Sequence, residues 1–177
     1  LLRYPDLKIV GNSKTLSMIG QFYDLNAGER SIVVKENDTL PLGQHTLRFY
    51  FAPMVHWPEV MMTYEESEQL LFSADAFGTF GALNGNLFND EVNFERDWLP
   101  DARRYYSNIV GKYGVQVQSA LKKVAGLPLR MICPLHGVVW RSDLDVLLDK
   151  YAHWSKYEPE EQAVAIFFVN VSATTEN

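Results

Sequence analysis

Three apolar segments of the chain each end close to a histidine or an aspartate, and this arrangement restricts the possible folds more than any other feature. The segment "LRFYFAPMV" precedes His56, "QLLFSA" precedes Asp75, and "RMICPL" precedes His136. Their apolar, β-branched and aromatic residues are typical of buried strands. Residues that follow such strands can meet at one edge of a sheet, although they lie far apart in the sequence.

Strand and helix patterns alternate along the rest of the chain, which predicts an α/β fold. Ser13 is the expected N-cap of the first helix. Residues 31–52 are expected to form a β-meander. The sequence predicts strands near 7–10, 31–35, 45–52, 60–64, 69–73 and 129–133, and helices near 14–23, 100–110, 115–125 and 142–156.

The two strands between His56 and Asp75 are expected to form a hairpin. Its turn, "EESE" at 65–68, is acidic and is expected to be a solvated tip. After Asp75, three glycines within 78–85 indicate a long ordered loop. Loops of this length often line a functional site.

Composition excludes several classes of function. The 177-residue chain is 47% hydrophobic, which indicates about one globular domain, and its formal net charge of -6 argues against nucleic acid or an anionic membrane as a partner. The apolar run at 163–169 is far shorter than the roughly 20 residues that span a bilayer. With no signal-peptide pattern at its start, a cytoplasmic protein is expected. Cys133 is the single cysteine, which excludes an internal disulfide, and we interpret it as a small buried hydrophobe rather than a reactive thiol.

The last part of the sequence indicates a domain boundary. Residues 158–162 are charged, lack apolar periodicity and follow the predicted domain 1–157 as a linker. The stretch 163–177 begins as a buried parallel strand, "AVAIFFVNV", and continues as a hydroxyl-rich loop, "SATTEN". The chain also starts without Met, so we expect both ends to be cut from a longer protein.

His56, Asp75 and His136 together suggest a metal site. Two imidazoles and a carboxylate suit zinc or iron, and a carboxylate between two ions can give one oxygen to each. Each residue alone also has a simpler explanation. His56 and His136 could be ordinary core or loop histidines, and Asp75 could cap a turn.

The segments "HWPEVMMTYEESEQLLFSADAFG" and "CPLHGVVWRSDLDVLLDKYAHW" resemble the second half of the diiron domain of flavodiiron proteins. The resemblance implies the C-terminal half of a metallo-β-lactamase-like αββα sandwich. In that family the matching residues bind iron, so it implies that His56 binds one iron, Asp75 bridges both and His136 binds the second. The family motif H-x-E-x-D-H, which supplies the other iron ligands, is not in this chain.

The stretch 163–177 resembles the first strand and phosphate loop of the flavodoxin-like domain that follows in this family. The resemblance implies that Ser172, Thr174, Thr175 and Asn177 contact the FMN phosphate. Thr175 stands where flavodoxins often have glycine, and a polar loop without a ligand is the alternative.

The resemblance implies an oxidoreductase that reduces O2 to water or nitric oxide to nitrous oxide at two non-haem irons supplied with electrons by FMN. It also implies a head-to-tail homodimer and rubredoxin or a similar protein as electron donor. One alternative is a zinc-dependent hydrolase of the same fold. Another is a partial domain that is inactive without the missing segments or a partner chain.

Other polar and aromatic residues are expected to have structural roles. His45 and His153 match no family ligand, and we expect them to be structural or solvent-facing. Glu59 could support His56, but a surface carboxylate is the preferred interpretation. The aromatic residues Tyr64, Phe77 and Trp140 are expected in the core or in the wall of the site.

Overall fold

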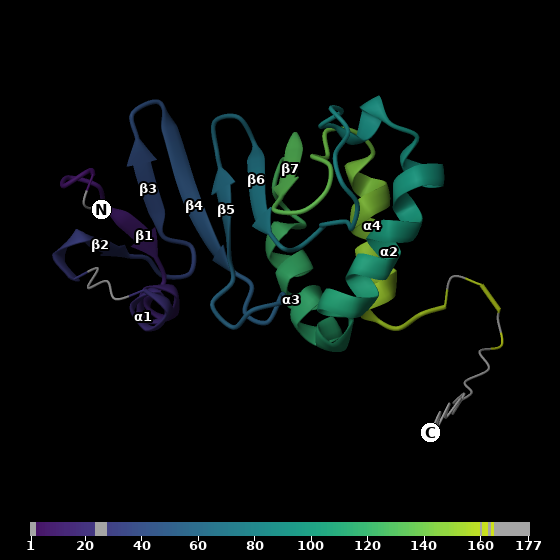
Figure 1. Cartoon of the computed structure of the whole chain (residues 1–177), viewed down its shortest axis with the longest axis horizontal. Helices are drawn as coiled ribbons and strands as arrows, with labels where there is room; N and C mark the ends of the chain where they lie inside the picture. The colour runs from purple at the N-terminus through teal and green to yellow at the C-terminus, as the bar shows by residue number, and fades with distance from the viewer. Residues whose placement is uncertain (1–2, 24–27, 160, 163, 165–177) are drawn as a thin grey trace, which may run out of the picture.

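The computed structural model describes residues 3–23, 28–159, 161–162 and 164 and has two sheets with helices packed beside them (Figure 1). The larger sheet has five strands in the order β3-β4-β5-β6-β7, and the smaller pairs β1 with β2. The strands are β1 (Ile9–Gly11), β2 (Ser31–Val33), β3 (Thr39–Leu42), β4 (His45–Phe51), β5 (Met61–Glu65), β6 (Leu70–Ala74) and β7 (Met131–Pro134). The α-helices are α1 (Ser13–Phe22), α2 (Leu99–Tyr105), α3 (Gly114–Val124) and α4 (Leu144–Ser155).

Strand directions in the larger sheet follow from its connections. Strands β3 to β6 form an antiparallel meander, because short turns join successive strands. Strand β7 pairs parallel with β6, with Leu71 opposite Ile132, after a long crossover that contains α2 and α3. Therefore β4, β6 and β7 all run in the same direction and end at the same edge of the sheet.

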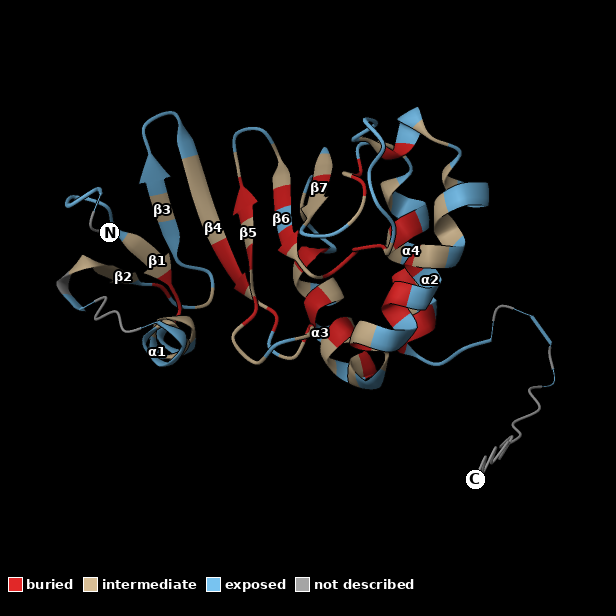
Figure 2. Ribbon diagram, viewed as in Figure 1, coloured by how far each residue is buried: buried red, intermediate tan, exposed pale blue. Residues whose placement is uncertain are grey.

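The core lies between the larger sheet and the helices α2, α3 and α4 (Figure 2). Side chains alternate along the strands, so Met62, Tyr64, Leu71 and Ile132 point into this core. The helices contribute residues spaced three or four apart, namely Val117, Ala120 and Val124 from α3 and Leu147, Tyr151 and Trp154 from α4. Phe72, at an alternate position of β6, is 46% exposed.

The predicted fold class is confirmed, and most predicted elements occur within a few residues of their expected bounds. Three details were wrong. Asn12, not Ser13, caps α1, since its side chain accepts a hydrogen bond from the N–H of Thr15. Strand β2 is not part of the meander but pairs parallel with β1. The strand β3 at Thr39–Leu42 was missed, because Pro41 and its exposed neighbours hide the alternating pattern.

The helical segment before α3 is longer than the sequence predicted. It begins with a π-helical turn at Phe94–Trp98, continues through α2 and ends with a second π-helical turn at Tyr106–Val110. Pro100 lies in the first turn of α2, a position that favours proline. The long loop predicted after Asp75 is confirmed as far as the π-helical turn that begins at Phe94.

The predicted second domain lies outside the described residues. This applies to 163 and 165–177, and therefore to Ser172, Thr174, Thr175 and Asn177. The boundary at 157 and the linker at 158–162 stay predictions. Among the described residues, no helix is both long and apolar enough to cross a membrane.

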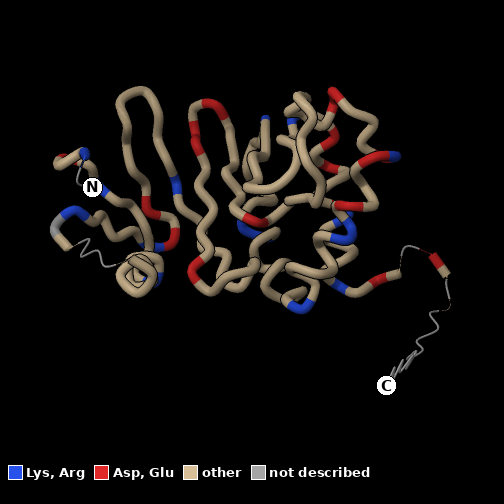
Figure 3. Tube along the Cα trace, viewed as in Figure 1, with Lys and Arg blue, Asp and Glu red and all other residues tan. Residues whose placement is uncertain are grey.

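The tip of the β5–β6 hairpin is acidic (Figure 3). It is not fully solvated, contrary to the sequence prediction. Glu65 is buried, and its carboxylate accepts hydrogen bonds from the N–H groups of Ser67 and Glu68 and lies 3.0 Å from Nδ1 of His45. Burial alone would raise the pKa of Glu65, but these partners lower it from 4.5 to about 2. The ionised carboxylate therefore holds the turn together.

We expect Glu65→Gln to lower stability at neutral pH and to flatten its dependence on acid. The folded-state pKa lies below the ordinary value, so the contribution of Glu65 is present above about pH 4.5 and is lost as the pH falls toward about 2. Urea midpoints measured from pH 6 to pH 2 test this. The control Glu68→Gln changes a half-exposed carboxylate at the same turn, and an equal change of slope in both variants would contradict the assignment.

Candidate metal centre

The three residues singled out by the sequence meet at one edge of the larger sheet. His56 lies in the turn that follows β4, Asp75 comes directly after β6, and His136 lies just beyond β7. Because β4, β6 and β7 run in the same direction, their carboxyl ends share this edge. Ligand sites commonly form at such strand ends.

The carboxylate of Asp75 lies between the two imidazoles. Its Oδ2 is 3.4 Å from Nε2 of His56, and its Oδ1 is 3.3 Å from Nε2 of His136. The predicted convergence of the three residues is therefore confirmed. The Asp75 side chain is 14% exposed, whereas that of His136 is 56% exposed, so the cluster is open on the His136 side.

The donor set fits metal ions. Both N···O separations exceed the roughly 2.9 Å of a usual N–H···O hydrogen bond. Two ligand atoms that are each roughly 2.1 Å from the same ion in tetrahedral geometry lie roughly 3.4 Å apart. Each imidazole faces a different carboxylate oxygen, so the residues fit two ions that share Asp75. No group of three or more His, Cys, Asp or Glu side chains in the described part of the chain could hold one ion together, so each ion would need further ligands.

Left-handed backbone conformations flank the cluster. Ala74, directly before Asp75, has φ +54°, and Met54 and Phe77 have φ +67° and +68°. Such values are strained for residues other than glycine and need support from their surroundings. The O of Ala74 accepts a hydrogen bond from the N–H of Leu135 at 2.9 Å, and the N–H of Phe77 donates to the buried Tyr151 hydroxyl at 2.8 Å. These bonds fix the segment that carries Asp75.

Tyr105 supports the cluster, and the sequence reasoning missed it. Its hydroxyl donates a hydrogen bond to the backbone O of Asp75 at 3.1 Å, and its ring centroid is 5.7 Å from that of His136. Burial, and then the Asp75 charge, raises the pKa of Tyr105, so the hydroxyl stays protonated. No sequence pattern pointed to Tyr105: its close packing on Gly78, where a Cβ would lie 2.9 Å from the ring, appears only in the fold.

A cavity of about 350 Å³ opens onto Asp75. Trp57, Leu135 and apolar residues of α1 line most of it, and Glu59 also lines it. One carboxylate oxygen of Glu59 is buried without a hydrogen-bond partner among the described residues, so the interpretation of Glu59 as a surface carboxylate was wrong. A small molecule that reaches the cluster through this cavity would pass mostly apolar side chains.

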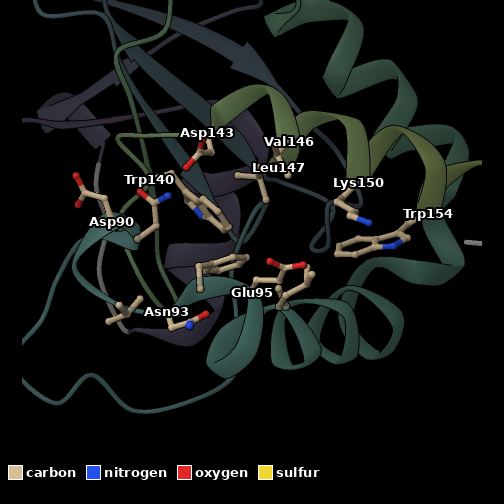
Figure 4. Close-up of a pocket in the computed structure, with 14 residues that line it drawn as sticks. Asp90, Asn93, Glu95, Trp140, Asp143, Val146, Leu147, Lys150 and Trp154 are labelled. Carbon is tan, nitrogen blue, oxygen red and sulfur yellow. The ribbon is translucent and has the colours of Figure 1, made fainter.

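A cavity of about 640 Å³ lies elsewhere (Figure 4). It is lined by Phe94, Trp140, Leu147, Lys150 and Trp154 among others and shares no lining residue with the cluster. Its size alone therefore gives no reason to place the metal chemistry there.

The remaining residues with expected roles lie in ordinary structural settings. His45 contacts Glu65. Nδ1 of His153 lies 3.3 Å from Oδ1 of Asp149 on the surface of α4, as expected. Tyr64, Phe77 and Trp140 are buried in the core, and the indole N–H of Trp140 donates to the O of Phe77. Cys133 is partly buried, and burial raises the pKa of its thiol, which fits an unreactive residue.

Comparisons with known proteins agree on one family. The model described as ODP family beta lactamase matches residues 1–137. An anaerobic nitric oxide reductase flavorubredoxin of Aeromonas hydrophila is 37% identical over 145 residues, which are 80% of this chain and 29% of that protein.

Solved structures give the same result. A flavo di-iron protein from Thermotoga maritima matches with a TM-score of 0.79 and 26% identity, covering 88% of this chain and 38% of that one. The rubredoxin oxygen:oxidoreductase of Desulfovibrio gigas matches with a TM-score of 0.77 and 31% identity, covering 86% of this chain and 38% of that one. The chain thus spans less than half the length of each of these relatives.

We expect Tyr105→Phe to destabilise the fold by about 1 kcal/mol, the usual contribution of one intramolecular hydrogen bond. The phenyl ring keeps the packing, so the loss reports the bond to Asp75. Chemical denaturation measures the change. Tyr4→Phe, at a 59% exposed tyrosine, is the control and should stay within about 0.5 kcal/mol of the original chain. Equal effects of the two substitutions would contradict a supporting role for Tyr105.

Proposed function

Since the chain belongs to the ODP family of beta lactamase-like proteins, in its flavodiiron branch, we propose that it is part of an oxidoreductase with a non-haem diiron centre. The whole protein would reduce O2 to water, nitric oxide to nitrous oxide, or both. The observation that carries the proposal is the single carboxylate of Asp75 with one imidazole at each of its oxygens. This pattern suits two ions better than one.

In this proposal His56 and His136 each hold one iron, and Asp75 holds both. The irons would supply one-electron redox chemistry and open positions for a small diatomic substrate. The carboxylate keeps the two imidazoles on opposite sides of itself, which sets the orientation of both rings. The Tyr105 hydroxyl fixes the backbone of Asp75 through its hydrogen bond. The apolar residues Trp57 and Leu135 limit the access of water to the cluster.

Electron supply depends on parts of the protein beyond the described residues. We propose that FMN binds to a flavodoxin-like domain that begins at 163–177, with Ser172, Thr174, Thr175 and Asn177 as phosphate contacts. A head-to-tail homodimer would bring the FMN of one subunit near the irons of the other. The donor would be rubredoxin or a similar protein, and the enzyme would be cytoplasmic. The names of the Aeromonas and Desulfovibrio relatives, which include rubredoxin, support this redox assignment over a zinc hydrolase.

In the full-length protein, Asp75→Asn should remove most of the bound iron, because the amide cannot supply a negatively charged oxygen to each ion. Metal analysis per chain measures this loss. Asp149→Asn, at an exposed aspartate of α4, is the matched control and should leave the iron content unchanged. Two irons per chain in Asp75→Asn would rule out the bridging role, and zinc without a flavin spectrum in the original protein would favour the hydrolase.

The 177-residue chain alone should bind iron weakly and reduce neither O2 nor nitric oxide at an appreciable rate. It supplies one imidazole and a shared carboxylate to each ion, which is too few ligands for tight binding. Iron titration and gas consumption with a chemical reductant measure both properties. Turnover by the purified chain would show that the missing segments are not needed for the chemistry.

A further inference from the structure

Thr79 carries a buried hydroxyl that no part of the proposed function uses. The residue is 2% exposed, and its Oγ1 has no hydrogen-bond partner among the described residues. A buried hydroxyl without a partner costs about 1–3 kcal/mol. Most buried polar groups have partners, so this exception requires a physical explanation.

Thr79 lies against the loop that carries His136. Its backbone N–H donates a hydrogen bond to the O of His136 at 3.2 Å. Gly137, which follows His136, has φ +82°. A Cβ at Gly137 would overlap the Thr79 hydroxyl and lie 2.9 Å from the Cβ of Thr79. Thr79 and Gly137 are therefore in close contact, directly beside the backbone of His136.

The ring of His136 also has an unused nitrogen. Its Nε2 faces Asp75, and no described residue forms a hydrogen bond with its Nδ1. A histidine that binds a metal ion through one nitrogen almost always donates the N–H of the other nitrogen to an oxygen, which fixes the ring. An acceptor for Nδ1 is therefore needed once Nε2 holds an ion.

We propose that Thr79 is a positioning residue for His136, and that its buried hydroxyl accepts the Nδ1–H of His136 when Nε2 binds a metal ion. The inference rests on the proposed function, because it requires metal at Nε2. It explains why a buried hydroxyl without a partner and a glycine that accommodates it lie together beside this histidine. In the metal-free protein the hydroxyl does not stabilise the fold.

The proposal predicts different effects of one substitution on metal affinity and on the stability of the metal-free protein. Thr79→Val keeps the shape of the side chain and removes only the hydroxyl. If the hydroxyl serves the ring, this variant should lose metal affinity without losing stability in the metal-free state, because an unpartnered polar atom is removed. If Thr79 only filled space, Thr79→Val would keep both the Fe²⁺ affinity and the stability.

The test uses the metal-free full-length protein, titrated anaerobically with Fe²⁺ against a coloured chelator, and the thermal melting of the same samples. We expect Thr79→Val to weaken Fe²⁺ binding about 10- to 100-fold, the usual effect of removing an outer partner of a metal ligand, and to melt no lower than the original protein. Thr79→Ser should retain most of the affinity. Ser155→Ala removes a buried hydroxyl that is already bonded to the O of Ala152 and should leave the affinity unchanged.

The outcomes distinguish failure of the Thr79 proposal from failure of the proposed diiron function. Unchanged Fe²⁺ affinity in Thr79→Val overturns the proposal and leaves the proposed function intact. Loss of folding in Thr79→Val, or equal loss of affinity in Thr79→Ser, also overturns it, because packing would then explain the effect. Failure of the original full-length protein to bind Fe²⁺ would instead refute the diiron function itself.

Discussion

Strands β6 and β7 lie side by side and run in the same direction, and the positions of Asp75 and His136 in the cluster depend on that pairing. A parallel pair needs a long crossover, and here the crossover supplies α2 and α3, which cover the sheet. The ends of the two strands stay joined past the last ladder pair, since the N–H of Leu135 donates to the O of Ala74. Asp75 and His136 then leave the sheet as neighbours.

The polar edge is held by the aromatic core beneath it. The backbone of Phe77 is bonded on both sides, through its N–H to Tyr151 and through its O to the indole of Trp140. Tyr105 adds a bond to the O of Asp75. Three large side chains from separate parts of the sequence thus bond to residues 75–77. This explains how the strained residues Ala74 and Phe77 keep their left-handed conformations.

The apolar patterns predicted four of the five strands of the larger sheet, and with them the strand ends that bring His56, Asp75 and His136 together, whereas β3 was missed. Other features depended on contacts between distant residues. Asn12 and Ser13 cap helices about equally well, and the choice follows from the amide of Asn12, which also donates to the O of Glu59. Glu65 belongs to an acidic run, yet its carboxylate accepts hydrogen bonds from two N–H groups of the turn. Thr79 and Tyr105 carry no motif, so only the folded loop reveals their neighbours.

The β5–β6 hairpin joins His56 to Asp75, and its turn lies at the end far from the cluster. Because the two strands are antiparallel, residues added in equal numbers on both sides of the turn would extend the hairpin outward and leave its base unchanged. A single added residue within one strand would instead reverse which face each later side chain occupies. The hairpin therefore acts as a spacer of adjustable length: the distance between the histidine and the aspartate in sequence can vary while their distance in space is conserved.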